Sequence, residues 1–270
     1  MPADQLAATT TGAGDRLVLV HGFTQTGRSW RHVAAALGDS YEVVAVDAPG
    51  HGDSAAVRAD VPAAARLLGQ AGGRATYLGY SMGGRLCLQL ALDRPTLVDR
   101  LVLVSATAGI DDDAERTARR DRDEQLARSI ECDGLDAFLV RWVAQPLFVG
   151  LSDPDLDDRR RNTVEGLATS LRMAGSGTQE PTWHRLATLP MPVLVVAGAL
   201  DSKFVALAER LAAAIPSADL AIIEGAGHTV HLERPTAVTD LLTTWLDRTT
   251  PSPPPPSGRD PFPGGFGPKR

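Results

Sequence analysis

Short runs rich in valine and leucine alternate with helical patterns along most of this chain of 270 residues. Six runs bounded by turn residues predict buried strands: Arg16–Val20, Glu42–Val46, Ala75–Gly79, Arg100–Ser105, Pro192–Ala197 and Asp219–Glu224. Helical patterns lie between or after them, at Ser29–Leu37, Val61–Gly69, Met82–Leu92, Phe204–Ile215 and Pro235–Leu246. Such alternation is typical of parallel strands joined by right-handed crossovers. The sequence therefore predicts an α/β fold, with a mostly parallel sheet of at least six strands flanked by helices.

The middle of the chain, from Ala108 to Arg185, shows no strand pattern. Asp111–Val143 predicts a helix, with charges on one face and a break at Gly134; its apolar stripe consists of Leu126, Ile130, Phe138, Leu139 and Trp142. Val164–Met173 predicts another helix. Because this block lies between two sheet strands, we expect a helical lid, residues 108–185, over the carboxyl edge of the sheet. Residues 1–107 and 186–248 would form the core, and the Pro- and Gly-rich residues 249–270 a disordered tail.

Composition and charge restrict the partners. The net charge of −6 argues against a nucleic-acid partner, and the longest apolar runs, such as Leu101–Val104, are too short to span a bilayer. The first residues lack the pattern of a signal peptide, and the two cysteines, Cys87 and Cys132, lack metal-like spacing. We therefore expect a cytoplasmic protein without a metal site. These features predict no oligomeric state.

The stretch Gly79-Tyr80-Ser81-Met82-Gly83-Gly84 follows a predicted strand and opens a predicted helix. Glycines on both sides of the serine permit a sharp turn, which exposes the hydroxyl at the helix N-terminus, where the dipole favours developing negative charge. A serine between two glycines is weak evidence alone, and an incidental serine in a tight turn is the alternative. The context makes Ser81 the predicted reactive group.

A serine hydroxyl needs a histidine as helper, and the histidine needs an acid to orient it. Asp201 and His228 each follow a predicted strand, in the chain order serine, acid, histidine. Both would lie beyond the carboxyl ends of strands, where the sites of open α/β sheets are found. His231 is the competing histidine, expected to serve packing or the surface, and Asp47 is the competing acid, expected to cap a turn.

An anion formed at this site needs backbone N–H donors. The backbone N–H of Phe23, in His21-Gly22-Phe23 after the first clear strand, and that of Met82 are the candidates for an oxyanion hole. We expect His21 and His51 to be structural, with direct proton transfer as the minority interpretation.

From Arg16 to Arg248 the chain resembles the α/β-hydrolase superfamily. Within it, the chain is most similar to the family of 2-succinyl-6-hydroxy-2,4-cyclohexadiene-1-carboxylate synthases of menaquinone biosynthesis. The shared motifs are His21–Gly27, Gly79–Arg85, the Arg-rich helix Glu115–Ala127, Arg141–Phe148 and Gly166–Arg172. The lid motifs are the more specific ones, because lids diverge between activities.

The resemblance implies a lyase without a cofactor. Such enzymes eliminate pyruvate from 2-succinyl-5-enolpyruvyl-6-hydroxy-3-cyclohexene-1-carboxylate, with the triad as a base and the oxyanion hole holding an enolate. It further implies that Tyr80, Arg85, Arg119 and Trp142 bind substrate. One more lid arginine would fall within Arg159–Arg161, of which we choose Arg160.

The charge pattern supports this independently. A substrate with three carboxylates must find cations concentrated at the site of an acidic protein, and arginine forks suit carboxylates. The lid helix carries Arg116, Arg119, Arg120, Arg122 and Arg128. Acidic residues interleave with them, so solvated helix pairs are the alternative interpretation. Two alternatives stay open: a carboxylesterase or C–C bond hydrolase with Ser81 as nucleophile, and an inactive member of the fold that binds a small ligand.

Overall fold

Seven strands form one sheet in the computed structural model, which describes residues 5–148, 150–151 and 156–249. The strands are β1 (Ala8–Thr11), β2 (Asp15–Val20), β3 (Tyr41–Val46), β4 (Ala75–Tyr80), β5 (Val98–Val104), β6 (Val193–Gly198) and β7 (Ala218–Ile223). Their order is β1-β3-β2-β4-β5-β6-β7, and all neighbours are parallel except β1 and β3. The predicted mostly parallel α/β sheet is confirmed.

The strand β1 is the one that the sequence patterns missed. Its four residues, Ala-Thr-Thr-Thr, are all exposed, so they carry no alternation of buried and exposed positions. Strand β1 exists through its antiparallel pairing with β3, where Ala8 lies opposite Val46 and Thr11 opposite Val43. A short polar strand of this kind protects the sheet edge, and only its tertiary partner reveals it.

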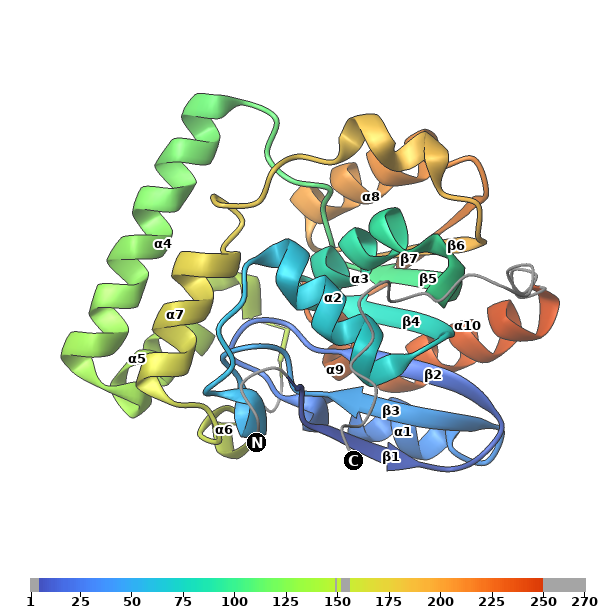
Figure 1. Cartoon of the computed structure of the whole chain (residues 1–270), viewed down its shortest axis with the longest axis horizontal. Helices are drawn as coiled ribbons and strands as arrows, with labels where there is room; N and C mark the ends of the chain where they lie inside the picture. The colour runs from blue at the N-terminus through green and yellow to red at the C-terminus, as the bar shows by residue number, and fades with distance from the viewer. Residues whose placement is uncertain (1–4, 149, 152–155, 250–270) are drawn as a thin grey trace, which may run out of the picture.

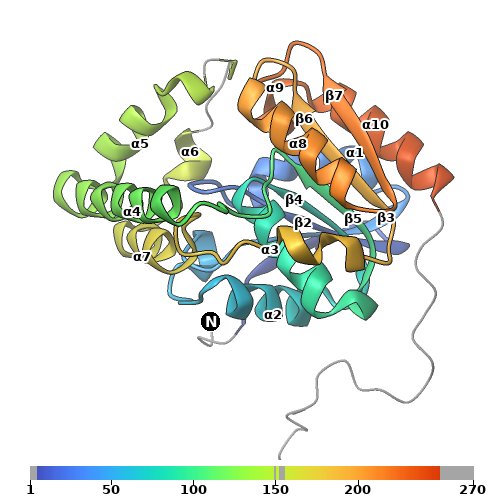
Figure 2. The ribbon, with the colours of Figure 1, turned by 90° about the horizontal axis from the view of Figure 1, so that it is seen from above.

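Helices cover both faces of the sheet because successive strand residues point to opposite sides. In β2, Val18 and Val20 pack with α2 (Val61–Gly72), α3 (Met82–Asp93) and α8 (Ser202–Ala214). Leu17 and Leu19 pack with α1 (Arg31–Leu37), α9 (Val230–Glu233) and α10 (Pro235–Arg248). Figure 2 shows the sheet between α2 and α3 on one side and α1 and α10 on the other. The sheet is therefore buried on both faces.

The lid helices form a separate packed group beside the sheet (Figure 1). They are α4 (Asp113–Asp133), α5 (Leu135–Val143), α6 (Leu156–Arg159) and α7 (Val164–Ala174). Ile130, Phe138 and Leu139 of the predicted stripe are buried in their shared core, with Leu167 and Leu171 from α7. Gly134, at φ +80°, separates α4 from α5 as its position in the sequence predicted. The boundaries of core, lid and tail stay predictions, and residues 250–270 lie outside the described residues.

Short 3-10 helices complete the described elements: Gly27–Trp30, Gly52–Ser54, Pro95–Leu97, Pro146–Phe148 and Trp183–Thr188. Among the described helices, none has the length and apolar character needed to cross a membrane.

Candidate active site

Ser81 occupies the sharp turn between β4 and α3. Its backbone lies at φ +50° and ψ −107°, in a region that L-residues rarely adopt, and its N–H donates to the Val104 carbonyl at 2.9 Å. A Cβ on Gly79 would lie 2.5 Å from the backbone nitrogen of Gly84. The turn therefore tolerates no side chain at its glycines, and the strain falls on the residue that carries the reactive hydroxyl.

Gly83→Ala is expected to destabilise the turn. The new Cβ would overlap the Val20 carbonyl oxygen and lie 2.6 Å from its carbon, which is β2 backbone and cannot rotate away. We expect unfolding to become easier by about 1–3 kcal/mol, as for other overpacked sites, visible as a lower midpoint in urea. Gly69→Ala is the matched control, since its Cβ meets only the side-chain ends of Leu90 and Leu97. Equal midpoints for wild type and Gly83→Ala would contradict the steric account.

The three predicted triad residues meet at the carboxyl ends of the strands. Nε2 of His228 lies 3.3 Å from Oγ of Ser81, and Nδ1 of His228 lies 2.8 Å from Oδ2 of Asp201. Burial raises the pKa of Asp201, but the hydrogen bond and charge of His228 outweigh it, and the net pKa is lowered. Asp201 is thus held as a carboxylate that can orient His228 and stabilise its protonated form. The geometry suits proton removal from Ser81, while the catalytic roles stay predictions.

The loop that carries His228 is fixed from both sides by residues that the sequence patterns did not indicate. The carboxylate of Glu233 accepts hydrogen bonds from the N–H of Gly227 at 2.7 Å and of Thr229 at 2.9 Å. The Ser105 hydroxyl donates to the His228 carbonyl at 2.8 Å. A glutamate five residues after a histidine has no distinctive signal, because its bonds go to backbone groups that only the folded loop presents.

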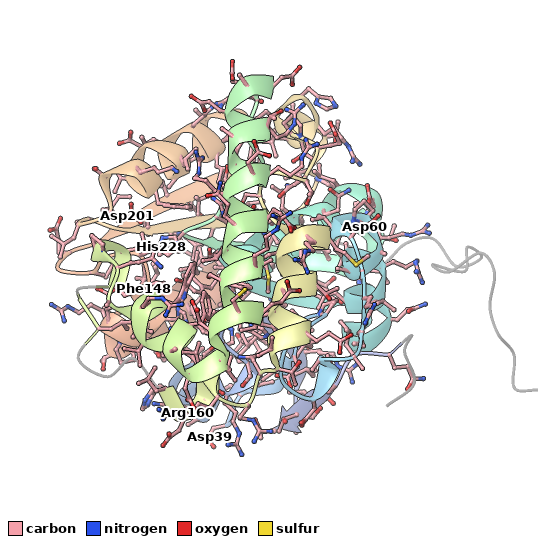
Figure 3. All side chains as sticks on the ribbon, turned by 90° about the vertical axis from the view of Figure 1, so that its left-hand side faces the viewer. Asp39, Asp60, Phe148, Arg160, Asp201 and His228 are labelled. Atoms are coloured by element: carbon pink, nitrogen blue, oxygen red, sulfur yellow. The ribbon has the colours of Figure 1, made fainter. Side chains whose placement is uncertain are left out.

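A cavity of about 470 Å³ opens above Ser81 between the sheet and the lid. All the residues predicted for triad, oxyanion hole and substrate line it, except Arg160: Phe23, Tyr80, Ser81, Met82, Arg85, Arg119, Trp142, Asp201 and His228. Arg122, one of the lid-helix arginines considered as cations of the site, lines it too, as do Gln145, Lys203 and Phe204, which were not predicted. Figure 3 shows Asp201 and His228 on the same face of the molecule as the lid residue Phe148.

Two backbone donors at this cavity have no acceptor. In the part of the chain that the structure describes, the N–H groups of Phe23 and Met82 donate no hydrogen bond. Both residues line the same cavity as Ser81, so their N–H groups are available to an acceptor that binds there. A pair of them beside Ser81 is what an oxyanion hole requires.

Arg85 brings a buried positive charge to the cavity. Its side chain donates to the Gln179 side-chain oxygen at 2.9 Å and to the Ala174 carbonyl at 2.8 Å, and it is 6% exposed. Burial, followed by repulsion from Arg119, lowers the pKa of Arg85 to about 10, so the group remains charged at neutral pH. Among the described residues it has no carboxylate partner within ion-pair distance. Its hydrogen bonds go to neutral oxygens and the charge of Asp123 offsets only part of the effect of burial, so the cation is suited to a ligand carboxylate.

The other predicted substrate residues differ in their bonding. Arg119 pairs with the buried carboxylate of Asp123 at 2.8 Å, so part of its charge is compensated within α4. Trp142 packs against Phe23 with ring centres 5.3 Å apart, and its buried Nε1 has no acceptor among the described residues. Tyr80 donates to or accepts from the Thr229 hydroxyl at 3.2 Å, and burial raises its pKa. Trp142 therefore offers a free N–H donor, whereas Tyr80 is a neutral residue that lines the cavity.

The structure does not bring Arg160 into the cavity. Its guanidinium is exposed and pairs with Asp136 at 2.7 Å and Asp157 at 3.0 Å; in Figure 3 its label stands well away from those of Asp201 and His228. The neighbouring Arg159 is the buried one, bonded to the Thr24 hydroxyl and placed over the Phe148 ring. Three consecutive arginines gave no signal to choose among them, because the orientation of the short α6 decides which one turns inward.

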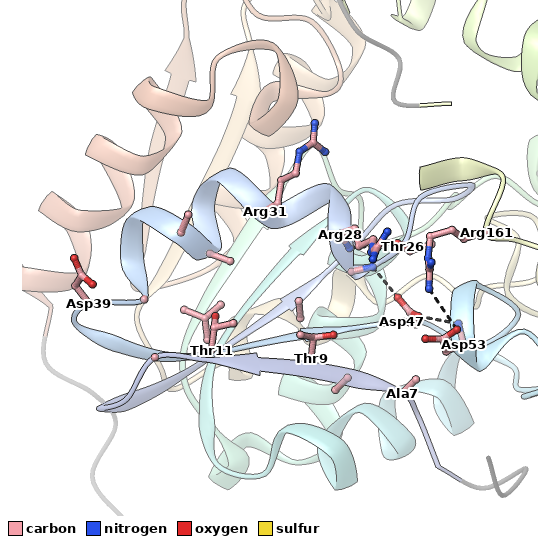
Figure 4. A pocket seen from close by; sticks show the side chains of 18 residues that line it. Ala7, Thr9, Thr11, Thr26, Arg28, Arg31, Asp39, Asp47, Asp53 and Arg161 are labelled. Atoms are coloured by element: carbon pink, nitrogen blue, oxygen red, sulfur yellow. Dashed lines mark hydrogen bonds and ion pairs between the residues drawn. The ribbon is translucent and has the colours of Figure 1, made fainter. Parts of the chain in front are cut away.

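A second cavity, of about 640 Å³, lies between α1 and the edge strands β1 and β3 and contains no triad residue (Figure 4). Asp47 lines it. The carboxylate of Asp47 accepts from the N–H of Gly27 at 2.7 Å and of Asp53 at 2.9 Å. Asp47 thus fastens two loops, as expected, and does not compete with Asp201 for His228.

Three further histidines are buried outside the triad. Nε2 of His21 accepts from the Ala48 N–H at 2.9 Å, and Nε2 of His51 accepts from the Thr24 N–H at 3.3 Å, so both rings are neutral and structural. His231 stacks on Trp30 with ring centres 4.1 Å apart. Burial lowers the pKa of His21 to about 4 and that of His51 to about 3, and it lowers the pKa of His231 well below its usual value.

These histidines predict that stability falls with pH below 6.5. From the usual pKa of 6.5 down to about 4, the unfolded chain binds protons that the folded His21 excludes, and folding loses free energy. Each such histidine contributes a slope of up to about 1.4 kcal/mol per pH unit. Urea unfolding between about pH 7 and pH 5 checks this, since carboxylates titrate mostly below that range.

His51→Gln should reduce the slope of stability against pH, whereas substitution of the exposed His32 by glutamine should leave it unchanged. A flat profile for the wild type over this range would contradict the neutral, buried state of the three rings.

Comparison with known proteins gives consistent similarities. The model of the alpha/beta hydrolase family matches residues 17–241. A Bacillus subtilis (strain 168) protein, provisionally named 2-succinyl-6-hydroxy-2,4-cyclohexadiene-1-carboxylate synthase, is 35% identical over 250 residues, which cover 87% of this chain and 91% of that protein. A protein of Enterobacter sp. (strain 638) with that synthase name is 31% identical over 238 residues, covering 84% and 89%. The solved structure of MenH from S. aureus gives a TM-score of 0.83 at 28% identity, covering 90% of this chain and 98% of that one.

Proposed function

The chain belongs to the family of 2-succinyl-6-hydroxy-2,4-cyclohexadiene-1-carboxylate synthases within the α/β hydrolases, and we propose that it catalyses the reaction of that name. It would eliminate pyruvate from 2-succinyl-5-enolpyruvyl-6-hydroxy-3-cyclohexene-1-carboxylate, in menaquinone biosynthesis. The family expected from the motifs is confirmed. A small-molecule substrate fits this enzyme; the cytoplasmic location and the absence of a nucleic-acid partner stay predictions.

The substrate and the product differ in the position of the double bonds and in the loss of the enolpyruvyl group. Ser81, activated by His228, removes the proton from ring carbon 2, next to the succinyl ketone, and His228 accepts the positive charge that Asp201 stabilises. The electron pair moves into the ketone to give an enolate, which accepts hydrogen bonds from the N–H groups of Phe23 and Met82. The N–H donors bind this oxygen more strongly as it gains charge, which lowers the barrier.

Collapse of the enolate forms the C2–C3 double bond and moves the C3–C4 double bond to C4–C5. The bond between carbon 5 and the enolpyruvyl oxygen breaks, and the oxygen leaves with the electron pair as the enolate of pyruvate. Protonated His228 then gives up its proton to balance the charge of the pyruvate enolate, so the triad ends in its starting state. No water and no covalent enzyme intermediate take part.

The observation that favours this reaction over ester hydrolysis is the buried, charged Arg85 in the cavity above Ser81. Hydrolysis of a neutral ester gives no reason to bury a cation, because an unpaired buried charge destabilises the fold. A substrate with carboxylates supplies the missing partner. The cation is thus expected where a polyanion binds.

Purified protein should be assayed with the cyclohexene substrate, following pyruvate, and in parallel with a neutral p-nitrophenyl ester. The proposal predicts fast pyruvate release and slow ester cleavage. Fast ester turnover without pyruvate would instead support the carboxylesterase that the same triad permits.

A further inference from the structure

The loop that carries Phe23 needs support from outside itself. It follows β2 and includes Thr24, which is fully buried at φ +70°. The left-handed region is unusual for a β-branched residue, because its Cβ crowds the backbone. A loop in this conformation is kept in place by contacts of its backbone with neighbouring segments.

Asn162, between α6 and α7 of the lid, makes the central contact. Its side-chain nitrogen donates to the carbonyl of Thr24 at 2.6 Å and to that of Arg159 at 2.8 Å. Its side-chain oxygen accepts from the Gly52 N–H at 3.0 Å. Asn162 is 4% exposed, and both of its donor hydrogens are used. One amide thus joins the lid, the Phe23 loop and the loop that begins at Asp47.

Neighbouring contacts hold the same loop but leave the Thr24 carbonyl to Asn162. The N–H of Thr24 donates to His51 at 3.3 Å, and the N–H of Thr26 donates to the lid residue Asp158 at 3.1 Å. These bonds fix the loop after Phe23 at several points. Two of these three hydrogen bonds, those to Asp158 and Asn162, come from the lid, which is distant in sequence.

We infer that Asn162 is a positioning residue that holds the Phe23 backbone N–H in register with the anion formed above Ser81. The inference rests on the proposed role of that N–H in the oxyanion hole. In the described part of the chain, Asn162 is not among the residues that line the Ser81 cavity, so it acts through Thr24 and not on the substrate. The lid thereby completes the catalytic site as well as covering it.

A misplaced oxyanion donor weakens the transition state more than substrate binding. Loss of one such donor costs on the order of 10²- to 10³-fold in kcat, and a displacement of about 1 Å can cost about 10²-fold. Loosening the Thr24 contact should therefore lower kcat by about 10- to 100-fold and leave KM within about threefold.

Asn162→Asp is the most specific variant, because it keeps the shape and the acceptor for Gly52 but loses both donors. Asn162→Ala removes all three bonds without adding a buried charge and serves if the aspartate variant does not fold. The matched control is Arg161→Ala. Arg161 is the adjacent residue, and its ion pair with Asp53, at 3.5 Å, links the lid to the loop after Asp47 (Figure 4). Among the described residues its side chain makes no hydrogen bond to the Phe23 loop.

Two readouts should be measured: kcat and KM, and amide hydrogen exchange of the peptide spanning residues 22–26. The inference predicts a lower kcat, unchanged KM and faster exchange in the Asn162 variants, with wild-type behaviour in Arg161→Ala. Unchanged kcat and exchange would overturn it. So would a rise in KM at constant kcat, or an equal loss in Arg161→Ala, which would show general loosening of the lid.

Kinetics should be measured with both the cyclohexene substrate and the p-nitrophenyl ester, since an oxyanion hole serves an enolate and a tetrahedral intermediate alike. If the wild type releases no pyruvate, the proposed lyase function fails. The ester kinetics and the exchange rates then still decide the role of Asn162.

Discussion

Ser81→Ala is expected to reduce kcat/KM for pyruvate release on the order of 10³- to 10⁴-fold, because the base that removes the ring proton is lost. The hydroxyl lies 3.3 Å from Nε2 of His228. Among the described contacts, no other group is placed to relay the proton there. Substrate affinity should change little, since Arg85 and the other residues lining the cavity remain. Steady-state pyruvate release and equilibrium binding of the substrate to the variant check the two parts.

The controls separate chemistry from folding. His228→Gln should cause a loss of similar size, and the double variant should lose little more, because the two groups act as one unit. Ser129→Ala, at a lid serine whose hydroxyl bonds, among the described residues, to the Leu126 carbonyl alone, should behave as wild type. Near-full turnover by folded Ser81→Ala would refute the proposed mechanism.

Arg85→Met is expected to reduce kcat/KM for the cyclohexene substrate by about 30- to 5,000-fold, mainly through KM. Truncating one partner of a buried, hydrogen-bonded charge pair costs about 2–5 kcal/mol. Methionine keeps much of the volume and removes the charge, so the packing against α7 should persist. Initial rates across a range of substrate concentrations give the KM and kcat separately.

The neutral p-nitrophenyl ester is the matched test of charge, because it has no carboxylate for Arg85 to bind. Its turnover should be nearly unchanged in Arg85→Met. Similar losses for both substrates would indicate damage to the turn at Ser81, and unchanged kinetics with the cyclohexene substrate would remove the carboxylate-binding role of Arg85.

The sequence patterns predicted the fold where burial and secondary structure leave a periodic trace. The buried strand β4 and the helix α3 were both predicted from local residues, and the turn at Ser81 followed from its glycines. The polar edge strand β1 was missed because its existence depends on β3. The short helices α6 and α9 were missed because one turn of helix has no period to detect.

In the candidate site, too, residues with a local sequence signal were predicted and those that depend on tertiary contacts were not. Ser81, Asp201 and His228 were found because each follows a strand, and parallel strands bring their carboxyl ends to one edge. Arg160 lies outside the Ser81 cavity, since neighbouring positions at a helix end face different directions and nothing local fixed the rotation of α6. Asn162 was missed because two of its partners are backbone groups of loops far away in the sequence. Glu233 was missed because it bonds to backbone N–H groups of a nearby loop that only the folded chain presents.

This Ser-His-Asp site is expected to eliminate pyruvate and not to hydrolyse the substrate. The most direct measurement is the identity and amount of the products formed from the cyclohexene substrate, followed by NMR until the substrate is consumed. The account predicts one pyruvate and one cyclohexadiene for each substrate molecule, with no cleavage of the succinyl chain. Release of succinate would show water attack at the ketone. Either this or consumption of substrate without pyruvate would contradict the elimination.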